Sequence, residues 1–295
     1  MLAIVLALSS SLAFGISDFY GALATRRIGA VSATFAAYSV ATIAVGVGLL
    51  LIPGAWSFDT VLAGAIAGVL VAFGFLLFFS AMSVGPVAVL APLIAVMYAI
   101  VPVAWDVARG ASLSALAWGG VIVAVLSVLA LSIPPRGGAE NEEERAAERA
   151  AGRGTGVRLG VIVMGALAAL GMGLASVALD YAPKDSGISS AFVESAVAVV
   201  VLGLVFVFSK RPAKGEVDSR ALGIAAGSGV LMAVANSTFV LALQNGSLAL
   251  VGVLVALYPL STILLARWVL REQLSRIQWL GIAGALAAAV LIGLG

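Results

Sequence analysis

The chain has 295 residues, of which 62% are hydrophobic and 10% are charged, with a mean hydropathy of +1.18. A soluble domain carries about 25% charged residues, so this composition excludes an ordinary water-soluble protein and predicts one embedded in a lipid bilayer. Cysteine and histidine are absent, and the net charge is +2. The sequence therefore predicts no disulfide, no metal site, no cofactor and no nucleic-acid partner.

Long apolar runs follow one another along the chain, each near the ~20 residues that cross the hydrocarbon core as a helix. They lack the polar alternation of a lipid-facing barrel strand. We therefore predict an all-α integral membrane protein with ten transmembrane helices. Their expected spans are 2–23, 31–52, 60–82, 86–107, 114–133, 157–179, 187–209, 221–243, 248–269 and 276–294.

The segment 65–124 occurs a second time at 226–285, with no gap and with about 16 of the 60 aligned pairs identical. Upstream the offset is 157 instead of 161, and aligns Ser32, Phe35, Val40 and Gly46 with Ser189, Phe192, Val197 and Gly203. We predict two five-helix repeats, 1–133 and 157–295, joined by a charged linker, 134–156. A partner-binding role is the alternative for that linker. Because five is odd, the second repeat should be inverted in the bilayer, as in secondary transporters.

Lys and Arg gather in the loops after the odd-numbered helices, whereas the opposite loops hold only Arg109 and Lys184. Cytoplasmic loops carry the excess of positive charge in membrane proteins. The charge distribution therefore predicts a bacterial-type cytoplasmic (plasma) membrane location, with the linker 134–156 in the cytoplasm and both termini outside. The basic residues are Arg26, Arg27, Arg136, Arg145, Arg149, Arg153, Arg158, Lys210, Arg211, Lys214, Arg220, Arg271 and Arg276.

Three short motifs carry a family resemblance: G-P-V-A-V-L-A-P-L at 85–93, L-Y-P at 257–259 and R-E-Q-L-S at 271–275. With them the chain resembles the drug/metabolite transporter (DMT) superfamily, in its EamA-type ten-helix branch. The resemblance implies a 5+5 bundle that moves small organic metabolites, often outward, through a central cavity. Two features depart from the family. The first repeat has Gly110-Ala111 where the second has Arg271-Glu272, and relatives are usually drawn with cytoplasmic termini.

Two acidic residues stand inside apolar segments, where a charge costs about 2.5–3.5 kcal/mol on insertion scales. Asp18 could bind a cation or a coupling proton, or could pair with Arg26 or Arg27 at the interface. Glu194 aligns with Ala37 of the first repeat. It could serve the same purpose, pair with Lys184, or be stabilised by its place near the N-terminus of its helix. By contrast, Trp105 and Asp106 are expected near the membrane interface.

Other candidates are uncharged. Asn236 could contact a substrate or hydrogen-bond another helix, and Tyr98 and Tyr258 could stack on a ligand or pack in the core. Proline within a helix frees a carbonyl and favours a bend. We therefore expect helix flex points at Pro92, Pro102 and Pro259.

The sequence contains no P-loop, metal-ligand cluster or activated nucleophile, and so predicts no enzyme and no catalytic residues. We predict a secondary active transporter that exports a small organic metabolite or drug by alternating access, and its carboxylates could couple this movement to protons. Uptake or facilitated exchange by the same fold, and a non-transporting membrane scaffold, are the alternatives. Substrate identity and oligomeric state stay open, and a monomer is compatible with the sequence.

Overall fold

The computed structural model describes residues 1–84, 99–131, 133, 159–208, 218–261, 264–265 and 275–294. Within these ranges the regular structure is entirely helical, and residues 99–108 form a further short helix. The linker 134–156, Pro92 and Tyr98 lie outside the described residues. The labelled helices are α1 (Leu2–Ile28), α2 (Ala30–Gly48), α3 (Phe58–Val84), α5 (Ala115–Leu131), α7 (Leu159–Asp180), α8 (Ser189–Phe208), α9 (Ser219–Asn245), α10 (Leu248–Val255) and α12 (Arg276–Leu294).

Each of the ten predicted apolar segments contains a helix among the described residues. Six of these helices are long and apolar enough to cross a membrane: Leu2–Thr25, Ala30–Gly48, Phe58–Leu77, Val163–Asp180, Ser189–Phe208 and Ser219–Asn245. The described parts of the other four are shorter. The chain is therefore a multi-pass helical membrane protein.

Some helix boundaries differ from the predicted ones. Helix α1 runs to Ile28, five residues beyond the predicted end, and stops at Gly29, whose φ of 80° suits a residue without a side chain. The ninth segment, predicted as one helix over 248–269, is interrupted after Val255. The apolar run does not mark this interruption, because hydrophobicity reports burial and not backbone continuity.

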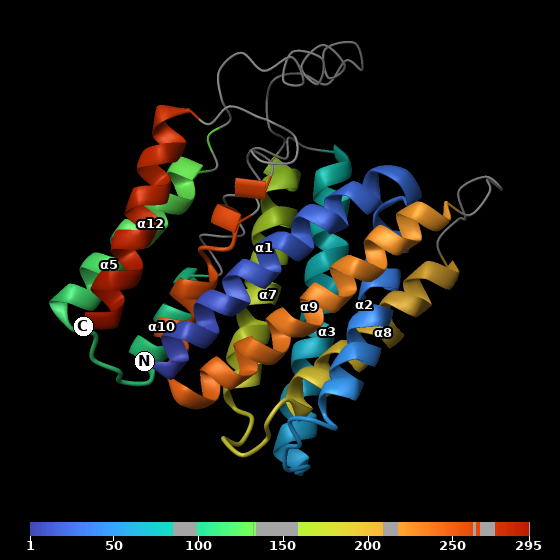
Figure 1. Cartoon of the computed structure of the whole chain (residues 1–295), viewed down its shortest axis with the longest axis horizontal. Helices are drawn as coiled ribbons and strands as arrows, with labels where there is room; N and C mark the ends of the chain where they lie inside the picture. The colour runs from blue at the N-terminus through green and yellow to red at the C-terminus, as the bar shows by residue number, and fades with distance from the viewer. Residues whose placement is uncertain are drawn as a thin grey trace.

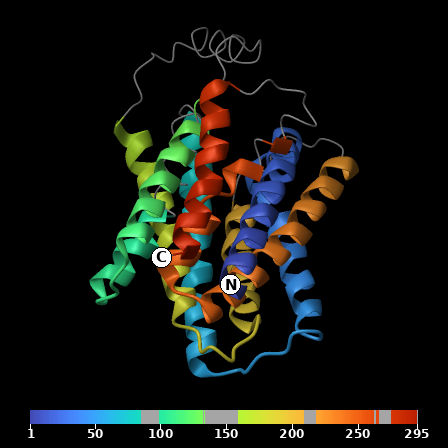
Figure 2. The ribbon, with the colours of Figure 1, turned by 60° about the vertical axis from the view of Figure 1, so that its left-hand side comes forward.

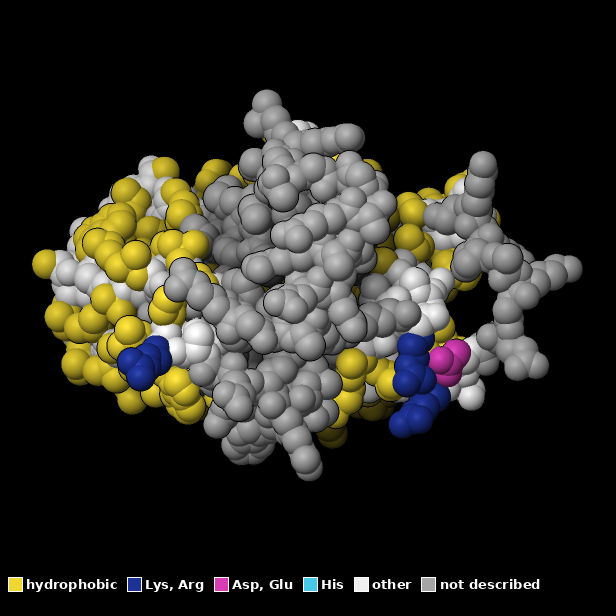
Figure 3. All heavy atoms as spheres, turned by 90° about the horizontal axis from the view of Figure 1, so that it is seen from above, with side chains coloured by type: hydrophobic (Ala, Val, Ile, Leu, Met, Phe, Trp, Pro, Cys, Tyr) yellow, Lys and Arg dark blue, Asp and Glu magenta, His cyan; other side chains and the backbone are white. Residues whose placement is uncertain are grey.

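The outward faces of the helices are apolar. On α8, for example, Val200, Leu204 and Val207 are exposed, three or four residues apart along one stripe. Figure 3, which looks onto one end of the molecule, shows hydrophobic side chains over both flanks and few described charged groups. Such a surface suits hydrocarbon and not water.

Helices from the two halves of the sequence pack against each other. α1 lies along α9, α3 lies along α7, and α5 pairs with α12 at one edge of the molecule (Figures 1 and 2). Figures 1 and 2 also place both termini toward the end where the loops 109–114 and 181–188 lie. Both termini and these two described loops thus share one end of the bundle, as expected for helices that alternate in direction.

Two helix crossings use aligned positions of the sequence repeat. A Cβ on Gly68 of α3 would lie 2.5 Å from the carbonyl oxygen of Glu194 in α8. A Cβ on Gly229 of α9 would lie 2.3 Å from the carbonyl oxygen of Ala37 in α2. Gly68 aligns with Gly229, and Ala37 aligns with Glu194, so the same close contact occurs twice with the halves exchanged.

The helices α2 and α8 cross in the same reciprocal way. A Cβ on Gly46 would lie 3.2 Å from the ring of Phe192, and one on Gly203 would lie 3.2 Å from the ring of Phe35. The later residue of α2 meets the earlier residue of α8, and the reverse. These two helices, which align in the repeat, therefore run antiparallel.

Candidate functional site

Asp18 lies on α1 beside the contact that fixes α1 to α9. Ser17 Oγ donates to the carbonyl of Ser228 at 2.9 Å, and Ser228 Oγ donates to the carbonyl of Ser17 at 2.9 Å. Asp18, one residue on, is exposed, and the described residues give its carboxylate no hydrogen bond or ion pair. The alternative pairing with Arg27 is not seen, and Arg27 lies 3.6 Å from Asp218 instead. The side chain of Arg26, the other alternative partner, lies outside what the structure describes.

Asn236 is buried within α9, with 6% of its surface exposed. The preceding residue, Ala235, accepts a hydrogen bond from Ser10 Oγ of α1 at 2.9 Å. No described residue hydrogen-bonds the Asn236 amide, so the interhelical bond considered above is not seen among the described residues. Asn236 thus lies level with Ser10, whereas Asp18 lies level with Ser228. Eight residues of helix separate these levels, about 12 Å, so Asp18 and Asn236 do not form one cluster.

Glu194 is the most deeply buried charged side chain among the described residues, with 2% of its surface exposed. Its Oε2 atom has no hydrogen-bond partner there, and neither has the Oγ atom of Ser190, one helical turn earlier. The alternative pairing with Lys184 does not occur, because Lys184 Nζ donates to the carbonyl of Leu243 at 2.6 Å. A polar stripe therefore lies unpaired in the core.

The interruption after α10 follows from proline chemistry. Pro259 has no N–H to donate to the carbonyl of Val255, four residues before it. The N–H of Tyr258 takes that carbonyl instead, at 3.0 Å, and Leu260 and Ser261 also bond three residues back. Pro259 therefore stands at a break in the helix, with the half-buried Tyr258 directly before it. Pro102 is buried inside the helix at 99–108, whose described part continues past it without a break.

Asp106, which the sequence placed near the membrane interface, is buried between helices at one end of the bundle. Only 9% of its surface is exposed, and its Oδ2 accepts a hydrogen bond of 2.7 Å from the backbone N–H of Ala249. This carboxylate therefore caps the start of α10 from a residue 143 positions earlier. A carboxylate at the end of a helix opposes that helix's own dipole. The position of Asp106 at the C-terminal end of its own helix was therefore the sequence signal that its carboxylate caps a different helix.

Arg109 makes a second connection at this end of the molecule. Its Nη1 lies 3.4 Å from Asp180 Oδ2, and its guanidinium lies 5.0 Å from the centre of the Tyr181 ring. At the opposite end, Asp218 caps α9 by accepting from the N–H of Ala221 at 3.0 Å. That hydrogen bond, followed by the attraction of Arg27, lowers the pKa of Asp218 from its ordinary value.

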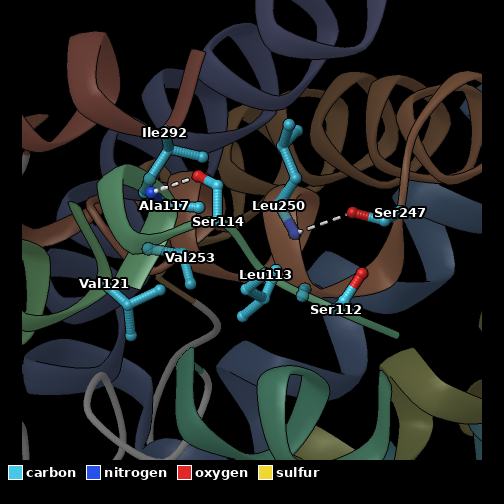
Figure 4. Close-up of a pocket in the computed structure, with 10 residues that line it drawn as sticks. Ser112, Leu113, Ser114, Ala117, Val121, Ser247, Leu250, Val253 and Ile292 are labelled. Carbon is cyan, nitrogen blue, oxygen red and sulfur yellow. Dashed lines mark hydrogen bonds between the residues drawn. The ribbon is translucent and has the colours of Figure 1, made fainter. Parts of the chain in front are cut away.

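A pocket of about 270 Å³ lies where α5 and α10 begin (Figure 4). Ser114 Oγ accepts from Ala117 N at 3.0 Å, and Ser247 Oγ accepts from Leu250 N at 3.3 Å, so each serine caps its helix. The rest of the lining is mostly aliphatic. None of the candidate residues predicted from sequence lines this pocket. The described lining is Ser112, Leu113, Ser114, Ala117, Val121, Ser247, Ala249, Leu250, Val253 and Ile292.

Comparison with known proteins agrees with this fold. Residues 159–294 match the model of the EamA-like transporter family. A solved structure described only as "Crystal structure of protein" superposes with a TM-score of 0.71, covering 97% of this chain and 96% of that chain at 19% identity. At that identity the likeness shows the fold alone. Comparison with curated proteins gave no match. The second half of the chain, residues 159–294, therefore belongs to the EamA-like transporter family of the drug/metabolite transporter superfamily.

Proposed function

We propose that this chain is a secondary active transporter that exports a small organic solute across the bacterial plasma membrane by alternating access. The repeats 1–133 and 157–295 would act as inverted halves, with the linker 134–156 in the cytoplasm and both termini outside. The observation that carries the proposal is the antiparallel crossing of α2 and α8 through aligned residues. Inverted repeats allow one protein to present the same site to either side by exchanging the conformations of its halves.

Contacts between the halves at one end provide a basis for gating. The hydrogen bond from Ala249 to Asp106 and the ion pair of Arg109 with Asp180 both join the first half to the second. Alternating access would require these contacts to break when that end opens. The interruption at Pro259, beyond the far end of α10, would supply a point at which this part of the chain can bend.

The solute or coupling ion would be bound by groups that the described residues leave without polar partners. Asp18, Asn236 and Glu194 meet this description, and Tyr98 and Tyr258 remain candidates from the sequence. Because Asp18 and Asn236 lie at different levels of the bundle, we propose that they act at successive positions along the path and not on one bound solute. The acids would permit coupling to protons.

The test begins with a thermal-shift screen of the purified chain against amino acids, amines and drugs. Compounds that stabilise it would then be loaded into proteoliposomes, with and without an imposed pH gradient. If a compound enters or leaves the vesicles only when the chain is present, the chain is a transporter. If the pH gradient accelerates this movement, transport is coupled to protons. A transport rate that is the same with and without the pH gradient would favour facilitated exchange. Failure of every stabilising compound to move would overturn the proposal in favour of a membrane scaffold.

A further inference from the structure

We propose that Glu194 and Ser190 of α8 form the binding site for a positively charged nitrogen of the transported solute. This inference rests on the transport function proposed above and names the chemical class of its substrate. Glu194 Oε2 and Ser190 Oγ are both buried and both without a hydrogen-bond partner among the described residues. Unpaired buried oxygen atoms of this kind are costly, so each one calls for an explanation.

Helical geometry brings the two side chains together. Ser190 and Glu194 are four residues apart, which places them one above the other on a single face of α8. Ser189 also has an unpartnered Oγ, but it lies about 100° further round the helix and is not part of this site. One face of α8 thus presents a carboxylate and a hydroxyl one turn apart.

The fold itself does not require an acid here. Gly68 of α3 packs on the backbone of α8 at Glu194, and Gly229 of α9 makes the matching contact on α2 at Ala37. Alanine stands at this position in the α2–α9 crossing. The close contact therefore needs only a backbone carbonyl on one helix and a glycine on the other. Burying the Glu194 carboxylate costs free energy, and the α3–α8 crossing does not need it. We attribute that cost to ligand binding.

The chemistry of the site selects a cation. A carboxylate accepts hydrogen bonds and attracts positive charge, and a serine hydroxyl accepts as readily as it donates. The described basic side chains with printed partners are engaged elsewhere: Arg109 with Asp180, Lys184 with Leu243 and Arg27 with Asp218. An ammonium group carries positive charge and several N–H donors, and so can satisfy both oxygens at once. An anionic solute would be repelled.

Access follows from the transport cycle. Glu194 is closed off in this structure, and its helix is held by the tight contact with α3. A solute therefore reaches the carboxylate when the halves separate on one side. This position suits a site that must be sealed from both sides of the membrane in the course of a cycle.

The test uses the full-length chain in detergent with defined probes: butylamine, benzylamine and phenethylamine, their N-acetyl derivatives, and the carboxylic acids of matching carbon skeleton. We expect at least one amine to raise the unfolding temperature, and its N-acetyl and carboxylate counterparts to have no effect. Glu194→Gln should weaken amine binding about ten- to a hundredfold, as loss of a charged hydrogen bond predicts. Ser190→Ala should weaken it less. Asp59→Asn, which removes an exposed carboxylate at the start of α3, should bind as the unaltered chain does.

Four outcomes would overturn the assignment: no binding of any amine, equal binding of the N-acetyl derivatives, unchanged binding by Glu194→Gln, or a Glu194→Gln variant that loses proton flux while amine binding persists. The last would identify Glu194 as a proton site. Elution of Glu194→Gln at the position of the unaltered chain in size-exclusion chromatography shows that it is folded. Transport of a neutral or anionic solute unaffected by Glu194→Gln would leave the transporter proposal standing and remove this one.

Discussion

A Cβ atom on Gly68 in α3 would lie 2.5 Å from the carbonyl oxygen of Glu194 in α8. No real side chain approaches a backbone oxygen so closely without a shift of one of the two helices. Because the helices come from different halves of the sequence, this glycine sets how near the halves can approach. In the same way, a Cβ atom on Gly229 would lie 2.3 Å from the carbonyl oxygen of Ala37.

We therefore expect Gly68→Ala and Gly229→Ala each to lower the free energy of unfolding by about 1–3 kcal/mol, the usual cost of an overpacked contact. Thermal unfolding of the purified chain in detergent measures this. Gly227→Ala is the control, because a Cβ there meets nothing within 4 Å. That variant should be neutral, or more stable by up to about 1 kcal/mol through the better helix propensity of alanine. Equal effects at all three glycines would contradict the close-contact explanation.

Removing the carboxylate of Asp106 should destabilise the start of α10. The N–H of Ala249 would lose its acceptor at 2.7 Å in a buried place. Asp106→Ala should therefore lower the free energy of unfolding by about 1.5–3 kcal/mol, the range for a hydrogen bond to a charged group. Asp106→Asn keeps a side-chain oxygen at the same position and should cost less. If Asn is as damaging as Ala, the charge and not the cap is the important feature.

Replacing Pro259 should restore helical continuity. In Pro259→Ala the new N–H can bond to the carbonyl of Val255, so α10 should extend and the chain should unfold at a higher temperature. If the interruption is a flex point, the same variant should move solute more slowly in proteoliposomes. Pro53→Ala, in an exposed loop, is the control and should leave the transport rate unchanged. A faster Pro259→Ala variant would contradict the flex-point role.

Asp218 should make part of the stability of α9 dependent on pH. Its pKa is lowered in the folded chain, chiefly by the hydrogen bond from Ala221 and also by Arg27. A lowered folded pKa means that the stabilisation is complete above the unfolded pKa of about 3.9 and is lost as the pH falls through the lower, folded value. The difference in unfolding temperature between the unaltered chain and Asp218→Ala should therefore shrink as the pH is lowered from 7 toward 3.

Asp218→Ser provides the matched comparison for this prediction. Serine keeps an oxygen that can accept from the N–H of Ala221 but has no charge to titrate. Its difference from Asp218→Ala should therefore stay constant over the same pH range. A difference that changes with pH in both comparisons would assign the effect to other carboxylates.

The sequence by itself determined that the chain is a helical membrane protein, and where its apolar segments lie. Composition and the length of each apolar run are enough for this, because a bilayer demands the same hydrophobic helix whatever its neighbours are. The self-similarity at an offset of 161 also pointed to Gly68 and Gly229 as equivalent positions. The sequence did not show whether these two glycines contact equivalent residues.

Tertiary structure alone decided which polar groups are partnered. Asp106 and Ala249 are 143 residues apart, and Arg109 and Asp180 are 71 apart. No local pattern encodes such pairs, since they form only when two helix ends from different halves meet. The same holds for Glu194, which the sequence allowed to pair with Lys184. Packing turned its side chain into the core and took Lys184 to a backbone carbonyl, because helix rotation is set by contacts around the whole bundle and not by spacing along one helix.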